Sequence, residues 1–296
     1  MAVRIGINPI TWSNDDLPEL GGDTPLETCL AETRQAGYAG TEMGGKFPRD
    51  AATLRPMLAR HGLAFVSGWY SAKLLERDAE AEIAAMAPHL ALLKAMGCPV
   101  MVFAETSGTV QGERGTPVSR RPRLDDDGWR RLLTRLEKVA AHLAASGVPM
   151  AFHHHMGTPI ETAAEIDRML AGTSEAVGLL LDTGHLTYAG EDPLAVLRRH
   201  GRRVNHVHCK DVRLDVLRAV KARDSSFLDA VLAGVFTVPG DGGVAFTPLL
   251  AELARLGYGG WLVVEAEQDP AKAHPLTYAT MGYRNLDAAA RAARLI

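Results

Sequence analysis

Short apolar stretches alternate with helical patterns along the whole chain, and this alternation constrains the fold more than any other feature of the sequence. Eight stretches have the composition of buried strands: residues 3–8, 40–43, 63–69, 99–105, 148–155, 177–182, 203–210 and 260–266. Several helical patterns between them end in a glycine shortly before the next strand, namely at Gly37, Gly62, Gly97, Gly147 and Gly257. Strands that alternate with helices form parallel sheets, because each helix carries the chain back to the start of the next strand.

Eight strand–helix units predict an α/β fold, a (β/α)8 TIM barrel, with residues 1–296 in one domain. A doubly wound open sheet is the alternative, but no glycine-rich phosphate loop opens the first unit. Two long loops follow the fourth and seventh strands, residues 106–124 and 212–244. In a barrel both would lie at the carboxyl ends of the strands, where long loops usually shape or cover a substrate site.

Polar side chains with the chemistry of metal ligands stand where four successive apolar strands end. They are His153, His154 and His155, then Asp182 and His185, then His206, His208 and Lys210, and finally Glu265 and Glu267. Active sites of parallel barrels lie at this end of the strands. Since a buried strand favours Val, Ile and Leu, the fold alone does not require these residues. The pattern predicts a metal-dependent enzyme.

Alternation along a strand sorts these residues by the face they occupy. His153 and His155 share one face while His154 takes the other, and Glu265 shares a face with Glu267. If the shared faces point into the barrel mouth, the site gathers His153, His155, Asp182, His185, His208, Lys210 and Glu265. Mixed imidazole and carboxylate ligands suit Mn, Co, Fe or Zn better than Mg or Ca. Any one cluster could be a solvated strand end or a helix cap, but four such coincidences on consecutive strands are much rarer than one.

Composition excludes other classes of protein. A formal charge of -3 gives no electrostatic reason to bind nucleic acid or an anionic membrane, and no apolar run is long enough to span a bilayer. The opening MAVRIGINPI lacks the pattern of a signal peptide. Cys29, Cys98 and Cys209 have no paired spacing, which indicates a reducing compartment. We expect a cytoplasmic enzyme that acts on a small molecule.

Longer motifs around these residues resemble a known family. The chain is similar to the xylose isomerase-like barrel superfamily and, within it, to the inosose dehydratases of myo-inositol catabolism. The resemblance covers nearly the whole chain and rests on GINPITWSNDDLPELGG, GGKFPRD, HHHMGT, LLDTGHLTYAGEDPL, HVHCKD, FTVPGDG and GWLVVEAEQDPAKA. DTGH or HVHCKD alone would indicate only the superfamily, whereas WSNDDLPELGG, HHHMGT and VVEAEQDPAKA together are more specific.

The resemblance implies a set of metal ligands. In the superfamily, one residue from each of strands five to eight holds a metal, usually Glu, Asp, His and Glu. These positions fall on His153, Asp182, His208 and Glu265. His153 replaces the usual Glu, so His154 and Glu105 stay open as alternatives for the first ligand. The resemblance also implies Mn or Co as the metal and glutathione as an additional cofactor, for which the sequence itself shows no site.

The reaction implied is the removal of water from 2-keto-myo-inositol, an inosose, to give a trihydroxycyclohexane-1,2-dione. A base removes the proton beside the ketone, and a β-hydroxyl then leaves. We expect His155 to transfer a proton and His185 to protonate the departing hydroxyl or to bind a substrate hydroxyl. Lys210 would place a positive charge near the ketone oxygen.

Five further residues are expected to shape the pocket for a cyclic polyol ketone: Asn8, Trp12, Glu42, Lys46 and Trp69. For the two tryptophans, core packing is the alternative. A ketose isomerase or epimerase of the same superfamily is the nearest rival, although His153 argues against a proton shuttle between two carboxylates. A DNA-repair nuclease and a non-catalytic sugar-binding protein fit less well. Barrels of this superfamily are commonly dimers or tetramers, so a homo-oligomer is compatible with the sequence.

Overall fold

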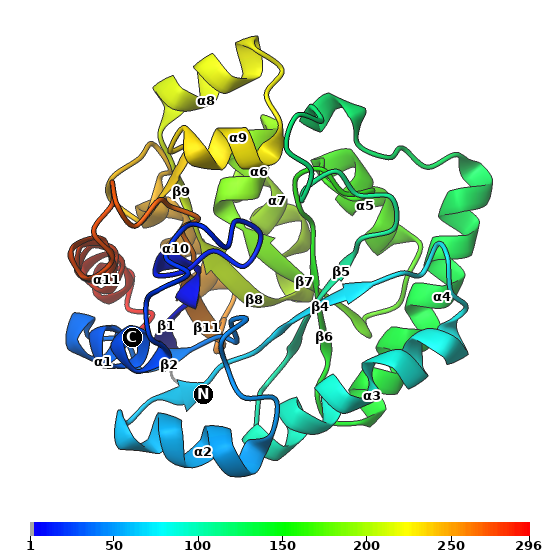
Figure 1. The fold of residues 1–296 in the computed structure, drawn as a ribbon. Helices are drawn as coiled ribbons and strands as arrows, with labels where there is room; N and C mark the ends of the chain where they lie inside the picture. The colour runs from blue at the N-terminus through cyan, green and yellow to red at the C-terminus, as the bar shows by residue number, and fades with distance from the viewer. Residues whose placement is uncertain (1–2) are drawn as a thin grey trace.

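Parallel strands form a barrel at the centre of the molecule, and helices surround it (Figure 1). The computed structural model describes residues 3–296. The strands of this sheet are β1 (Arg4–Ile7), β2 (Gly40–Thr41), β3 (Ala64–Phe65), β4 (Trp69–Ala72), β5 (Met101–Glu105), β6 (Met150–His153), β7 (Val177–Asp182), β8 (Val204–Cys209) and β11 (Trp261–Val264). They are joined in the order β3, β2, β1, β11, β8, β7, β6, β5, β4, and each neighbouring pair is parallel. The predicted α/β barrel is confirmed.

The two edges of the sheet belong to one extended segment, residues 64–72. Its first part, β3, pairs with β2, and its second part, β4, pairs with β5, so the segment closes the barrel. The sequence predicted a single strand over 63–69, and this extent is wrong. Regular pairing stops before Gly68, where a Cβ atom would meet the His89 ring at 2.8 Å. Close approaches of this kind often interrupt a strand.

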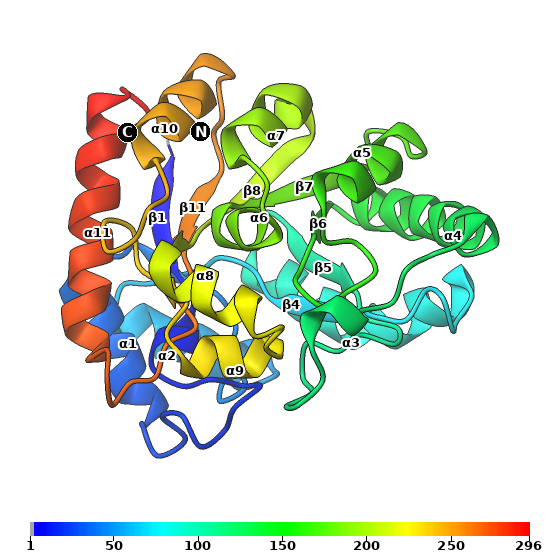
Figure 2. The same cartoon turned by 90° about the horizontal axis from the view of Figure 1, so that it is seen from above.

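Helices cover the outside of the barrel, and neighbours such as α1 and α11 or α3 and α4 pack against each other (Figure 2). The helices of this layer are α1 (Leu26–Ala36), α2 (Ala51–Arg60), α3 (Ala79–Met96), α4 (Asp126–Ala145), α5 (Ala163–Ala171), α6 (Thr183–Ala189), α7 (Pro193–His200), α10 (Phe246–Arg255) and α11 (Pro275–Ala292), with 3-10 turns η1 (Pro9–Thr11), η2 (Val118–Arg120) and η3 (Gly201–Arg203). Within residues 3–296 no helix combines the length and the apolar character that a membrane crossing needs.

Local sequence explains where these helices begin and end. Asp50, Asp78 and Asp125 precede α2, α3 and α4, and each side chain accepts a hydrogen bond from the third residue of its helix. The five glycines predicted to end helices all have a positive φ, from 63° at Gly62 to 111° at Gly37. This left-handed conformation costs glycine little and ends a helix sharply, so these predicted ends are confirmed.

Alternation along the strands separates an outer layer of side chains from an inner one. Phe103 and Phe152 point outward and join the large core between the sheet and the helices. Val102, Ala151 and Leu180 point inward and form a small apolar floor inside the barrel. Because side chains alternate, residues two positions beyond this floor point into the mouth of the barrel.

Two long segments extend from the carboxyl ends of β5 and β8 (Figure 2). The second of them holds β9 (Asp211–Val212), α8 (Leu214–Ala222), α9 (Phe227–Leu232) and β10 (Phe236–Thr237), and β9 pairs with β10 in an antiparallel arrangement. The two segments contact each other through a bridge between Pro117 and Ser226 and an ion pair of 3.3 Å between Arg114 and Asp229. They therefore brace one another beside the barrel mouth.

Candidate active site

Four potential metal ligands converge at the mouth of the barrel. His153, Asp182, His208 and Glu265 stand at or just after the ends of β6, β7, β8 and β11, on the inward faces of these strands. One ligand atom from each lies within 4.8 Å of the others, and all four side chains are buried. The structure thus brings together the four residues that the resemblance implied.

Two atoms of this cluster have no hydrogen-bond partner. They are Nε2 of His153 and Oδ2 of Asp182, which lie 3.6 Å apart and are both buried. The other ring nitrogen of His153, Nδ1, lies 2.5 Å from the carbonyl oxygen of His154. Since a carbonyl only accepts, Nδ1 carries the proton and Nε2 presents a lone pair. Buried atoms of this kind are costly when left alone, and a divalent cation would satisfy both.

Glu42 holds the third ligand in place. Its carboxylate lies 3.1 Å from Nε2 of His208 and 2.8 Å from Nε2 of His206, and it accepts a hydrogen bond of 2.9 Å from Asn8. Although burial raises it, the pKa of Glu42 is lowered overall by His208 and His206. Metal-binding histidines usually donate their second N–H to such a carboxylate. The opposite nitrogen of His208, Nδ1, faces Glu265 at 3.0 Å.

The alternatives for the first ligand lie elsewhere. His154 points away from the cluster, and its Nε2 accepts the backbone N–H of Asp182 at 3.3 Å. Glu105 accepts backbone N–H groups of Leu74 and Ser107, at 2.6 and 2.9 Å. Neither belongs to the group of four. The geometry therefore favours His153.

Lys210 is fully buried among the acidic residues. Its Nζ lies 2.8 Å from Glu265, 2.9 Å from Glu267 and 3.0 Å from Nε2 of His185. Burial alone would lower the pKa of Lys210, but the carboxylates raise it overall, so the amine stays charged. The stem of the lysine passes over Gly184, where a Cβ atom would meet its Cγ at 2.4 Å. A glycine at the start of α6 is what makes room for this buried cation.

Two imidazoles lie beside this lysine. The ring centroids of His155 and His185 are 3.9 Å apart. Nδ1 of His155 lies 2.8 Å from the carbonyl oxygen of Met156, so the proton sits there and Nε2 holds the free lone pair. Burial lowers the pKa of both histidines, and nearby positive groups, Lys210 among them, lower it further. Both rings are thus neutral near pH 7, the form in which an imidazole accepts a proton.

A cavity of about 220 Å³ opens above these groups. His155, His208, Glu265 and Glu267 contribute to its lining, and Trp69 forms part of its wall. The Trp69 ring meets the ring of His155 edge-on, at 5.6 Å between centroids. An aromatic wall opposite polar groups is a common arrangement in pockets for small polar rings.

The five residues expected to contact substrate divide into two groups. Asn8, Glu42 and Trp69 line the cavity. Trp12 is buried in the core, and its indole N–H donates to Glu32 at 2.6 Å. Lys46 donates to the carbonyl oxygen of Gly21 at 3.0 Å. Trp12 and Lys46 therefore stabilise the loop after β1 instead of lining the cavity, which corrects the expectation for both.

Glu267, Asp15 and Asp16 also line the cavity, and the sequence analysis assigned none of them a role in the site. For Glu267 a signal existed, because it shares a strand face with Glu265. The two aspartates follow η1 in an irregular loop, where no periodicity indicates which way a side chain points.

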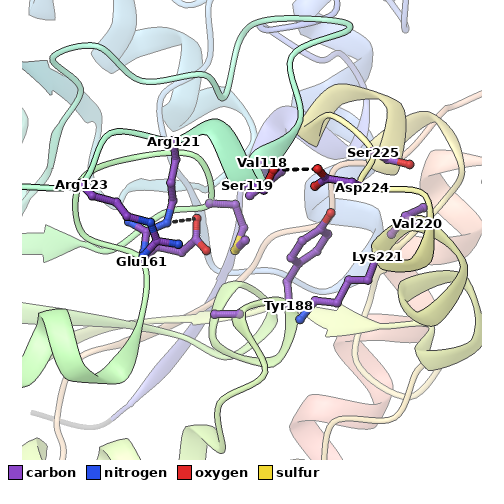
Figure 3. Close-up of a pocket in the computed structure, with 12 residues that line it drawn as sticks. Val118, Ser119, Arg121, Arg123, Glu161, Tyr188, Val220, Lys221, Asp224 and Ser225 are labelled. Atoms are coloured by element: carbon purple, nitrogen blue, oxygen red, sulfur yellow. Dashed lines mark hydrogen bonds and ion pairs between the residues drawn. The ribbon is translucent and has the colours of Figure 1, made fainter.

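A second cavity, of about 150 Å³, lies between the two long segments (Figure 3). On one side Arg121 pairs with Glu161 at 3.2 Å, and on the other Ser119 donates to Asp224 at 2.7 Å. The ring of Tyr188 lies beside the second of these pairs, with its hydroxyl end toward Asp224 (Figure 3). No residue in this lining was predicted to belong to the site, and none lines the larger cavity. We therefore place the candidate active site at the cavity of about 220 Å³.

Residues 30–291 match the family described as xylose isomerase-like TIM barrel. This chain belongs to that family. It is 57% identical over 294 residues to the rhizopine catabolism protein MocC of Rhizobium meliloti. The aligned region covers 99% of this chain and 90% of MocC. It is 46% identical over 279 residues to an inosose dehydratase of Geobacillus thermodenitrificans, with 94% of each chain covered. A xylose isomerase domain protein from Planctomyces limnophilus shares the fold, with a TM-score of 0.71 at 16% identity and 100% of both chains covered.

Several inosose dehydratases are 41–46% identical to this chain over nearly its whole length. The resemblance indicated by the motifs is thereby confirmed, and the chain is an enzyme of the lyase class, a dehydratase. Its buried cluster of histidine and carboxylate side chains could hold a divalent metal.

Proposed function

We propose that this member of the family is a metal-dependent inosose dehydratase, which converts 2-keto-myo-inositol into a trihydroxycyclohexane-1,2-dione. One observation carries the proposal: four convergent metal ligands, of which His208 and Glu265 line the cavity, lie beside a neutral histidine that lines the same cavity, in a chain closely related to enzymes of that name. Dehydration beside a ketone needs both parts. A cation must stabilise the negative charge that forms on the ketone oxygen, and a base must take the α-proton.

His153, Asp182, His208 and Glu265 would hold the metal, and the two unpartnered atoms described above support this set. Two nitrogen and two carboxylate ligands suit Mn, Co, Fe or Zn, and among these the resemblance implies Mn or Co. When bound, the ion would act as a Lewis acid toward the substrate oxygens. Glutathione remains an expectation from the resemblance, and we assign no residue to it.

His155 is the proton-transfer group in this proposal. Its Nδ1 is fixed by Met156, so Nε2 is left to accept the proton from carbon. The same proton can then pass to the departing hydroxyl, which leaves as water, so no proton accumulates on the enzyme. His185 does not line the cavity but contacts His155 and Lys210. We therefore assign it to holding these two groups in position, in place of the acid role considered from the sequence.

Lys210 supports the reaction from below the cavity. Its charge lies against Glu265 and Glu267, which both line the cavity. The cation favours the ionised form of both carboxylates, although burial and Glu265 still raise the pKa of Glu267 to about 7. It also adds positive potential where the ketone oxygen becomes negative. Trp69 and Asn8 would contact the ring and its hydroxyls.

The direct test is a spectrophotometric assay of metal-stripped protein with 2-keto-myo-inositol, to which Mn, Co, Zn or Mg is added back singly. We expect dione formation to return with Mn or Co. If the protein binds metal but forms no dione with any ion, the proposal is wrong. Exchange of the α-proton in D2O without dione would then favour the isomerase or epimerase alternative.

A second candidate is a role in rhizopine catabolism, supported by the 57% identity to MocC. Growth on rhizopine, compared between a strain with this gene and one without it, distinguishes this role. A defect on rhizopine but not on myo-inositol would favour it.

A further inference from the structure

The rim of the cavity carries two carboxylates that the proposed reaction does not use. Asp15 and Asp16 line the same cavity as His155. The side chain of Asn14 accepts the backbone N–H of Asp16 at 2.8 Å, and this local turn fixes the loop. One oxygen of Asp15 accepts the N–H of Gly45 at 2.7 Å, which ties the rim to the loop after β2. The carboxylate of Asp15 and the backbone of Asp16 are therefore held at the entrance.

No lysine, arginine or histidine within residues 3–296 pairs directly with the carboxylate of Asp15 or Asp16, and the described lining of the cavity contains no lysine or arginine. Six carboxylates lie at or beneath the cavity: Asp15, Asp16, Glu42, Asp182, Glu265 and Glu267. Against these negative charges there are the positive charge of Lys210 and, in the metal-loaded enzyme, the two positive charges of a divalent ion. Even with Glu267 counted as neutral, five negative charges face three positive ones, so the entrance keeps a negative potential when the metal is present.

An ionised carboxylate can only accept hydrogen bonds. Hydroxyl and ammonium groups of a ligand can donate to Asp15 and Asp16, whereas the oxygens of a phosphate or carboxylate would face them acceptor to acceptor and with like charge. Trp69, on the wall of the same cavity, offers an apolar surface to the face of a ring. The rim thus suits a ring that presents donors at its edge.

We propose that Asp15 and Asp16 select the substrate by charge, so that uncharged and cationic cyclic polyols enter the site and phosphorylated polyols are excluded. The identity of the reacting ring rests on the proposed function, but the charge preference rests only on the cavity. It separates this enzyme from isomerases and epimerases that act on sugar phosphates, which must compensate a phosphate with positive side chains.

The test compares three ligands that share one ring and differ in charge: myo-inositol, an inositol with one hydroxyl replaced by an amino group, and myo-inositol monophosphate. Their dissociation constants are measured by calorimetry on the Mn-loaded protein. We expect the phosphate to bind about tenfold or more weakly than myo-inositol, and the amine to bind at least as tightly. Wild-type protein that binds the phosphate as tightly as myo-inositol would overturn the proposal.

The variants Asp15→Asn and Asp16→Asn, alone and combined, keep the shape of the rim and remove its charge. In the double variant the ratio of the phosphate and myo-inositol dissociation constants should fall about tenfold, and the advantage of the amine should disappear. Asp23→Asn is the matched control, because Asp23 is exposed in the same loop and does not line the cavity. An unchanged ratio in the double variant would refute the role of the rim.

Because these measurements need no turnover, the two proposals can fail separately. Protein that keeps the charge preference but forms no dione contradicts only the dehydratase proposal. Protein that forms dione but accepts the phosphate equally well contradicts only the selection by charge. In the dehydration assay, Asp16→Asn should raise KM for the inosose more than it lowers kcat, since the rim contacts the ring and not the reacting atoms.

Discussion

Replacing Glu42 by Gln tests whether this carboxylate orients a metal ligand. Glu42 receives three donors, Nε2 of His206, Nε2 of His208 and the amide of Asn8. A glutamine offers one acceptor oxygen and turns its NH2 group toward donors, so at least one buried donor loses its partner. That loss costs about 1–3 kcal/mol of folding stability. Loss of the carboxylate that orients a metal-binding histidine typically weakens metal binding about 10–100-fold, or about 1.4–2.8 kcal/mol.

The assay is competition of the protein with a chromophoric chelator for Co, followed at neutral pH. Glu82→Gln is the control, because Glu82 is also fully buried and accepts hydrogen bonds from Tyr70 at 2.6 Å and from the backbone of Lys73 at 3.1 Å. It should lose stability but keep the wild-type affinity for metal. The reasoning is refuted if Glu42→Gln folds and binds Co as tightly as the wild type, or if Glu82→Gln weakens binding equally.

Three further substitutions test the site. His155→Ala should lower kcat about 10²–10⁴-fold while the circular dichroism spectrum stays native, and near-normal turnover would exclude the proton-transfer role. Lys210→Met leaves buried carboxylates without their cation, so the free energy of unfolding in urea should fall by about 3–5 kcal/mol, and an unchanged value would contradict the burial argument. Gly184→Ala places a Cβ atom 2.4 Å from Cγ of Lys210 and should cost about 1–3 kcal/mol, seen as a lower Tm; an unaltered Tm would mean that the lysine has room to move.

Much of the barrel could be predicted, because its signals are local and periodic. The glycines after the helices and the alternation along the strands depend only on neighbouring residues. The break between β3 and β4 was not predicted; it coincides with the approach of Gly68 to His89, a contact across 21 positions of the chain. A contact between residues so far apart in the sequence leaves the local sequence pattern unchanged.

The predictions for the site also differ between residues on strands and residues in loops. Strand periodicity predicted that His153 and His155 share a face and that His154 does not, and the structure has this arrangement. Trp12 and Lys46 follow strands in irregular loops, where the direction of a side chain is set by distant partners such as Glu32. The resemblance marked those loops as characteristic, but it did not say which of their residues face the cavity.

The contact between the two long segments also limits how this enzyme can be recombined with its relatives. Val118 donates its N–H to the carbonyl oxygen of Ser225, and Arg114 pairs with Asp229, so each segment presents an edge that fits the other. A chimaera that exchanges residues 106–124 alone would leave the edge of 212–244 facing a foreign loop. Exchange of both together preserves the match, so the two segments are best exchanged as a pair.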